Sequence, residues 1–236
     1  MMEAGEFEQL LPLLGREDVM IVARAWFHLT RVKTLLDGHG VPWGSLSDKH
    51  ASRWDCPDKL AFTLVMRDLA NGAMISEQDW RRVTESLPVK VDGVELFVRG
   101  TKARWKKLEC GREPVRGLDG VAEWGAAPGF VQMVVDGRWK KDMPLLLSEA
   151  IDRFGVEVVR NPRVRIGTCH SVKGLEAENV FCLSKSTPAA AAEEETCLKY
   201  VTITRASVNY RLVVDPFDLA RNVPLFWAAP RGAQAG

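Results

Sequence analysis

The sequence has 236 residues, of which 46% are hydrophobic and 27% are charged. This composition supports a hydrophobic core in one domain or in two small domains, and it argues against intrinsic disorder and fibrous repeats. Because the formal net charge is only +1, any contact with nucleic acid depends on a local basic patch.

No apolar stretch reaches the roughly 20 residues that a transmembrane helix needs. Residues 1–9 are acidic and mixed, unlike a basic and apolar leader. The five cysteines include no C-x-x-C pair, which argues against a disulfide framework and against a zinc site. We therefore expect a reduced, cytoplasmic protein with no membrane partner and no metal ligands of its own.

The first predicted elements form a strand followed by a helix. A short apolar segment at residues 7–14 is a helix candidate, and residues 18–23 form an apolar run of strand length. Residues 26–36 then repeat apolar side chains at helical spacing, and glycines at 38 and 40 end the pattern. This order is typical of an α/β layer.

The middle of the chain, residues 43–162, has a different pattern. Helices are predicted at residues 57–69, 80–87 and 143–154, and Ser76 with Asp79 indicates a variant of the capping box before the second of these. The glycine-, proline- and tryptophan-rich stretch between residues 89 and 137 shows little periodicity. We interpret the whole segment as an inserted mixed subdomain.

The strand and helix alternation returns after Pro162. Strands are predicted at residues 164–167, 179–183 and 208–214, with a helix at 193–206. The sequence therefore predicts one α/β domain made of residues 1–42 and 163–220, interrupted by the insertion at 43–162. Residues 221–236 form a tail.

Two segments carry chemistry. Residues 168–176 read Thr-Cys-His-Ser-Val-Lys-Gly-Leu-Glu, and such a loop offers donors and close backbone approach to phosphate or ribose oxygens. Residues 193–206 end in Thr-Arg-Ala, where Arg205 can present a planar fork of donors to a transferring phosphoryl group. Taken separately, an ordinary polar loop and a surface arginine paired with the preceding glutamates explain them equally well.

Taken together, these segments closely resemble motifs V and VI of superfamily 1 DNA helicases of the UvrD-like kind. In that family a T-x-H-S-x-K-G-x-E loop precedes an E-E-x-x-x-L-x-Y-V-x-x-T-R-A helix. Residues 18–24, an apolar run ending in Arg24, similarly resemble motif IV, although Trp26 and Phe27 stand where small polar residues are usual. Ala177, in place of an aromatic residue, is similar to phage and short bacterial members.

The resemblance implies an α/β fold, namely a RecA-like second motor domain of the P-loop NTPase type, with helices flanking a parallel sheet. It implies that Arg205 is the arginine finger, that Arg24 is a second contact to the γ-phosphate, and that Gly174 and Glu176 lie near the nucleotide. It further implies that four polar residues connect the nucleotide to single-stranded DNA: Thr168, His170, Ser171 and Lys173.

The P-loop itself is missing, because the sequence contains no G-x-x-x-x-G-K-[ST] motif. Residues 134–136 and 213–215 are candidates for strands ending in aspartate, but neither has the following glutamate that would activate water. We expect the missing N-terminal P-loop helicase domain to hold ATP with Mg²⁺, and this chain to be inactive alone.

A basic patch within the insertion is a further candidate. Basic side chains neutralise phosphates and an aromatic ring can stack on a base; the residues concerned are Lys102, Arg104, Trp105, Lys106 and Lys107. A solvated basic loop is the alternative explanation, and the other tryptophans are more typical of a core than of contacts.

The sequence thus predicts the C-terminal half of an ATP-dependent DNA helicase acting on single-stranded or forked DNA, with 3′–5′ polarity implied by the resemblance alone. The alternative is a non-catalytic DNA-binding or regulatory module that keeps the fold without turnover.

Overall fold

A computed structural model describes residues 17–108, 115–184 and 200–214. The chain divides into two compact units, of which one combines Met1–Ser52 with Pro162–Gly236 and the other is Arg53–Asn161. The helix predicted at residues 7–14 and the tail at 221–236 lie outside the described residues.

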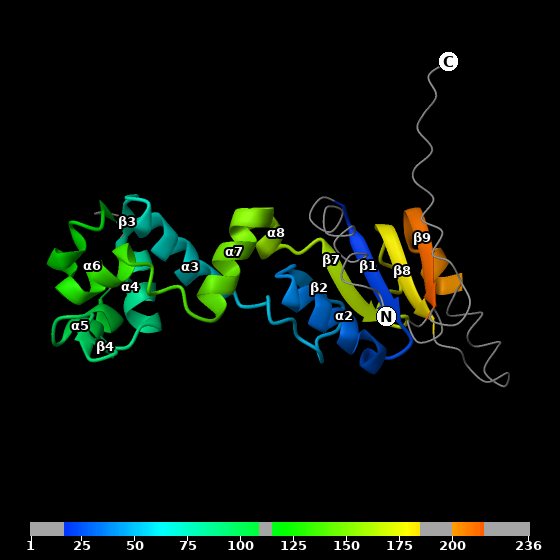
Figure 1. Cartoon of the computed structure of the whole chain (residues 1–236), viewed down its shortest axis with the longest axis horizontal. Coiled ribbons are helices and arrows are strands. Elements are labelled where there is room, and N and C mark those ends of the chain that lie inside the picture. The colour runs from blue at the N-terminus through cyan, green and yellow to red at the C-terminus, as the bar shows by residue number, and fades with distance from the viewer. Residues whose placement is uncertain (1–16, 109–114, 185–199, 215–236) are drawn as a thin grey trace, which may run out of the picture. The chain divides into compact units, whose positions relative to one another are not determined.

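The first unit contains a five-stranded sheet in which all neighbouring strands are parallel. Its strands, in spatial order, are β2 (Trp43–Ser45), β7 (Val164–Thr168), β1 (Val19–Ala23), β8 (Ala177–Ser184) and β9 (Ala206–Val214), and Figure 1 shows the four longer ones side by side. The predicted α/β class with a parallel sheet is confirmed.

Both faces of the central strand are covered, which explains why every residue of β1 is buried. Helix α2 (Trp26–Gly38) packs against β1 and β7 and buries Leu29 and Leu36. The other face carries an apolar cluster that includes Met20, Val22 and Val180. This second face is the one over which the predicted site segments lie.

Strand β2 corrects one predicted boundary. Residues 43–45 were assigned to the insertion, but Trp43 pairs with Val164 of β7, and the Trp43 indole Nε1 donates to Asp37 Oδ1 at 2.9 Å. The sheet unit therefore continues to Ser52. A strand of three residues is too short to produce a periodic signal in the sequence.

The helix predicted at residues 193–206 ends earlier than expected. In its described part the chain is helical from Tyr200 to Ile203, turns at Thr204 and Arg205, and enters β9 at Ala206. The Ala177 N–H donates to the Arg205 carbonyl at 3.0 Å, which joins the backbone to the sheet at this point.

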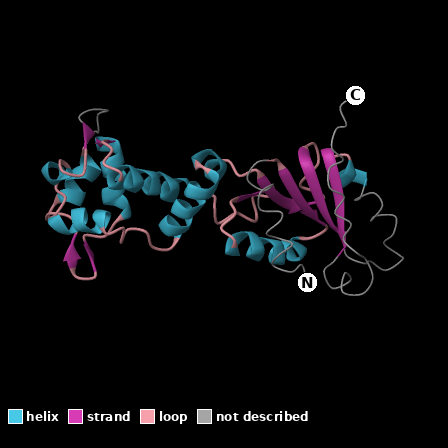
Figure 2. Cartoon of the chain, turned by 45° about the horizontal axis from the view of Figure 1, so that its top comes forward, coloured by secondary structure: helices cyan, strands magenta, loops and turns pink. Residues whose placement is uncertain are grey.

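The second unit is mainly helical (Figure 2). Its helices are α3 (Pro57–Ala70), α4 (Glu77–Ser86), α5 (Thr101–Lys107), the 3₁₀ turn η1 (Val121–Trp124), α6 (Pro128–Val135), α7 (Met143–Phe154) and α8 (Val156–Arg160). Two small antiparallel ladders pair β3 (Ile75–Ser76) with β6 (Val115–Arg116) and β4 (Lys90–Val91) with β5 (Val94–Glu95). The predicted helices at 57–69, 80–87 and 143–154 correspond to α3, α4 and α7.

Aromatic rings form the centre of this unit. Trp80 meets Phe130 edge to face with ring centroids 5.0 Å apart, and Trp105 meets Trp124 in the same way at 5.6 Å. The Trp105 and Trp80 indoles both donate to the Trp124 carbonyl, at 2.8 and 3.3 Å. The indole N–H groups of Trp80 and Trp105 are thereby satisfied inside the apolar cluster, whereas the buried Trp139 Nε1 has no hydrogen-bond partner among the described residues.

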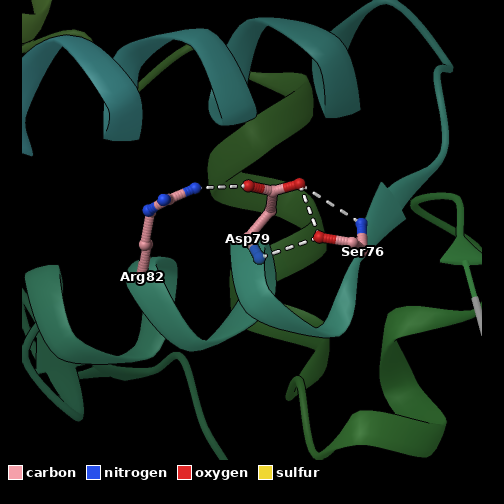
Figure 3. A network of polar contacts seen from close by, with 3 residues as sticks. All are labelled: Ser76, Asp79 and Arg82. Carbon is pink, nitrogen blue, oxygen red and sulfur yellow. Dashed lines mark hydrogen bonds and ion pairs between the residues drawn. The ribbon is translucent and has the colours of Figure 1, made fainter. Parts of the chain in front are cut away.

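The predicted capping box at the start of α4 is confirmed (Figure 3). The Asp79 N–H donates to Ser76 Oγ at 3.2 Å, and the Ser76 N–H donates to Asp79 Oδ2 at 3.4 Å. The other carboxylate oxygen of Asp79 accepts from Arg82 at 2.8 Å. Aspartate thus does the work that glutamate or glutamine does more often at this position.

The strand considered at residues 134–136 is wrong. Val134 and Val135 belong to α6, and Asp136 is the residue that caps the end of this helix. Pro128 in the first turn favours a helix here, and three apolar residues were too few to distinguish a strand from a helix. Asp215, at the end of the other run, lies outside the described part.

Candidate functional site

The loop at residues 168–176 crosses one face of the sheet. It leaves the carboxyl end of β7 and enters β8 at its amino end, and β1 lies between these two parallel strands. A connection between parallel strands of one sheet has to return to the opposite edge. The beginning and the end of the predicted motif therefore lie at different edges.

The beginning of the loop is fixed to the carboxyl edge by its own backbone. The Cys169 N–H donates to the Ala23 carbonyl at 2.9 Å, next to the end of β1. The backbone N–H and the Oγ of Ser171 both donate to the Thr168 carbonyl at 2.9 Å. Thr168 and Ser171 are half-buried, and both belong to a tight turn rather than to an extended loop.

In the middle of the loop, buried residues alternate with exposed residues. Cys169 and Val172 are buried in the apolar cluster of this face, whereas His170, Lys173 and Gly174 are exposed. Gly174 has φ of +82°, a left-handed conformation that suits glycine. His170 and Lys173, which are predicted to contact DNA, are therefore exposed to solvent, while the buried side chains of Cys169 and Val172 anchor the loop to the sheet.

Arg205 joins the end of this loop, although about 30 residues of sequence separate them. Its Nη1 donates to the Leu175 carbonyl at 3.5 Å, and its own carbonyl accepts from Ala177. The Arg205 Nε also donates to the Val201 carbonyl at 3.2 Å, and Nη2 donates to Thr204 Oγ1 at 3.0 Å. The structure thus brings the two predicted site segments together at the amino edge of the sheet.

Arg165 is a member of this site that sequence reasoning missed. Its Nη2 donates to the Glu176 carbonyl at 2.8 Å, and the Glu176 side chain is exposed beside it. The one available signal was a charged residue within an otherwise apolar strand of an all-parallel sheet, where continuous apolar runs are usual.

A buried polar contact lies beneath the Arg205 turn. Thr202 is fully buried, and its Oγ1 lies 3.2 Å from the hydroxyl oxygen of Tyr210 on β9. Burial, followed by interaction with the Cys182 thiol, raises the pKa of Tyr210 to about 12, against the lowering effect of its hydrogen bond with Thr202. Tyr210 therefore stays neutral and ties the helix before Arg205 to the strand after it.

Arg24 lies at the other edge of the sheet. Ala23 pairs with Leu183 of β8 and Ala206 pairs with Ala177, and these two positions on β8 are about 20 Å apart at roughly 3.3 Å per residue. Arg24 directly follows Ala23, at the carboxyl edge of the sheet, and Arg205 directly precedes Ala206, at the amino edge. That both guanidiniums contact one γ-phosphate stays a prediction, with the main chains of the two arginines at opposite edges of the sheet.

In the basic patch on α5, most of the charged side chains are exposed, but the aromatic ring is buried. Trp105 is 1% exposed and part of the core of its unit, so its ring cannot stack on a base, and that prediction is wrong. Arg104, Lys106 and Lys107 are exposed, whereas Lys102 is half-buried and its Nζ donates to the Leu87 carbonyl at 2.6 Å. On a helix of this amphipathic kind, the largest apolar side chain faces the core.

Within the described ranges, no three or more His, Cys, Asp or Glu side chains are placed to hold a metal ion together. None of the helices in the part of the chain that the structure describes is long and apolar enough to cross a bilayer. No protein-family model matches the chain, and no curated protein matches it.

Proposed function

We propose that this chain is the RecA-like second motor domain of a UvrD-like superfamily 1 DNA helicase, completed by an N-terminal P-loop domain. The observation that carries the proposal is the contact between Arg205 and the end of the loop at residues 168–176. These are the two segments that resemble motifs V and VI, and a shared nucleotide site requires them to be adjacent in space.

The chemistry of the amino edge fits a nucleotide phosphate. Within the described ranges, the acceptors that hold the Arg205 guanidinium are neutral oxygens of Leu175, Val201 and Thr204, which do not compensate its positive charge. Five N–H groups in a planar fork suit the charge that spreads over a transferring phosphoryl group. The exposed carboxylate of Glu176 is a suitable acceptor for a ribose hydroxyl.

The two edges of the sheet suggest two tasks. The proposal assigns Arg205 and Glu176 to ATP at the amino edge, and it assigns Arg24 with Thr168 and Ser171 to the carboxyl edge, nearer the bound strand. Because the loop spans both edges, it is the element through which the nucleotide site acts on DNA. The P-loop domain supplies the lysine and the Mg²⁺ ligands.

The exposed basic side chains of α5 add a second DNA contact in the proposal. Arg104, Lys106 and Lys107 carry three positive charges on a short helix. Contacts of this kind neutralise phosphates without reading sequence, and their contribution falls as salt rises.

The test is an ATPase assay with single-stranded DNA, using the chain alone, a P-loop domain of a UvrD-like helicase alone, and the two mixed. We expect the ATPase rate of the mixture to exceed the sum of the rates of the chain alone and the P-loop domain alone. Arg205→Ala should lower kcat by about 10³-fold or more, as expected for an arginine finger, whereas Arg160→Ala, at an exposed arginine of α8, should not. A mixture without turnover that still binds DNA would favour the non-catalytic module.

A further inference from the structure

Arg165 occupies an unusual position for a cation. It is the second residue of β7 and pairs with Met20 of β1, one of the buried residues of the apolar cluster. Paired residues of neighbouring strands point to the same face, so Arg165 shares the face that the loop at residues 168–176 covers. The half-buried side chain ends on the carbonyl of Glu176, the last residue of this loop.

The two arginines at the loop end hold it differently. Arg165 donates to the Glu176 carbonyl at 2.8 Å, a short bond from a charged donor. Arg205 donates to the neighbouring Leu175 carbonyl at 3.5 Å, at the limit of hydrogen-bonding distance. The bond from Arg205 to Leu175 is therefore the weaker of the two and the one that a phosphate replaces, while the bond from Arg165 persists.

We propose that Arg165 is a positioning residue for nucleotide binding, because it fixes the main chain at Glu176 while Arg205 leaves Leu175 to reach ATP. This inference rests on the proposed function. Arg165 makes no contact with ATP in this proposal, and its guanidinium acts through the main chain of Glu176, a residue whose side chain is exposed.

The different roles of Arg165 and Arg205 predict that their loss affects different kinetic constants, KM in one case and kcat in the other. Loss of Arg165 frees the backbone at Glu176, which weakens ATP binding in the ground state and in the transition state alike and so raises KM with little change in kcat. Loss of Arg205 removes an interaction made in the transition state and so lowers kcat. A purely structural role for Arg165 would lower thermal stability without this separation of KM from kcat.

The experiment measures kcat and KM for ATP in the mixture of the full chain with the P-loop domain. Arg165→Met keeps the aliphatic stem and removes the donors, and we expect KM to rise about ten-fold with kcat within about two-fold. Arg165→Lys keeps a single donor group and should raise KM about three-fold. Arg160→Met, at an exposed arginine of α8, is the matched control and should change neither value.

Thermal unfolding of each variant is measured first, and the kinetics are run below the lowest transition. If Arg165→Met does not fold, Arg165→Lys decides the question. An unchanged KM in the folded variants, with Arg205→Ala still abolishing turnover, overturns the role of Arg165 and leaves the proposed function intact. A mixture without turnover, or one indifferent to Arg205→Ala, overturns both.

Discussion

At the scale of single residues, neighbours on α5 have opposite environments. Trp105 is enclosed by the aromatic core and donates its indole N–H to Trp124, whereas Lys107, two residues later, is exposed. The sequence shows that both are near a basic patch, but it does not show which side of a seven-residue helix faces inward. Burial separates Trp105, which stabilises the unit, from Lys107, which is presented to solvent.

Trp105→Ala and Lys107→Ala should therefore differ in stability and in DNA binding. The first removes a buried indole and should lower the free energy of unfolding by about 3–5 kcal/mol, while the second should change it by less than about 0.5 kcal/mol. Urea unfolding followed by tryptophan fluorescence measures both. Lys107→Ala should weaken single-stranded DNA binding and reduce its salt dependence, as for loss of one phosphate contact. A stable Trp105→Ala variant with weakened DNA binding would restore the stacking role.

At the scale of elements, the loop at residues 168–176 depends on a glycine in the strand before it. A Cβ on Gly167 would lie 2.5 Å from Ser171 Oγ and 2.7 Å from the Cβ of Leu46. Both distances are too short for real atoms, and the Leu46 Cβ is held close to the backbone. The close approach of the loop to β7 therefore requires glycine for space, not for an unusual φ.

Gly167→Ala should displace the start of the loop and lower the free energy of unfolding of the sheet unit by about 1–3 kcal/mol through overpacking. Gly44 on β2 is a matched control, because it lies in the neighbouring strand and a Cβ there would meet nothing within 4 Å. Gly44→Ala should leave stability unchanged or raise it by up to about 1 kcal/mol. Thermal unfolding of the two variants compares them directly; equal losses would show that the loop does not approach β7 this closely.

The elements also show what sequence reasoning can reach. Periodicity located β1, α2, α3, α7 and β7, and local chemistry located the capping box, because each signal resides in a few consecutive residues. Strand β2 and the end of the helix before β9 were misplaced because their limits are set by pairing with distant residues, Val164 and Ala177. Long-range pairing leaves little trace in a local pattern.

At the scale of the whole molecule, the same limit explains the candidate site. Motif resemblance selected Arg205 and Glu176, which the fold brings to one edge of the sheet. It also grouped Arg24 with them, although strand register places Arg24 at the other edge. Arg165 was missed, since its proximity to Glu176 follows from a hydrogen bond that spans eleven residues and crosses the face of the sheet. Edge assignment requires the topology as well as the motif.

The organisation into two units has a consequence for folding. The second unit is one continuous segment, Arg53–Asn161, with a hydrophobic core built from its own residues, whereas the sheet unit is made from two separated parts of the chain. A segment of about 100 residues with its own core is large enough to fold alone. Independence would also explain how a chain can carry an insertion without disturbing the sheet.

We predict that a fragment of residues 53–161 folds by itself and unfolds cooperatively in urea, followed by tryptophan fluorescence. Phe130 is fully buried at the centre of the aromatic cluster, so Phe130→Ala should lower the midpoint of this transition, corresponding to about 3–5 kcal/mol. Glu149→Ala, at an exposed position of α7, should leave the midpoint nearly unchanged. The same variants in the full chain should show the same differences, because the cluster belongs to this unit alone. A fragment without a cooperative transition, beside a full chain that has one, would mean that the sheet unit is needed to complete the core.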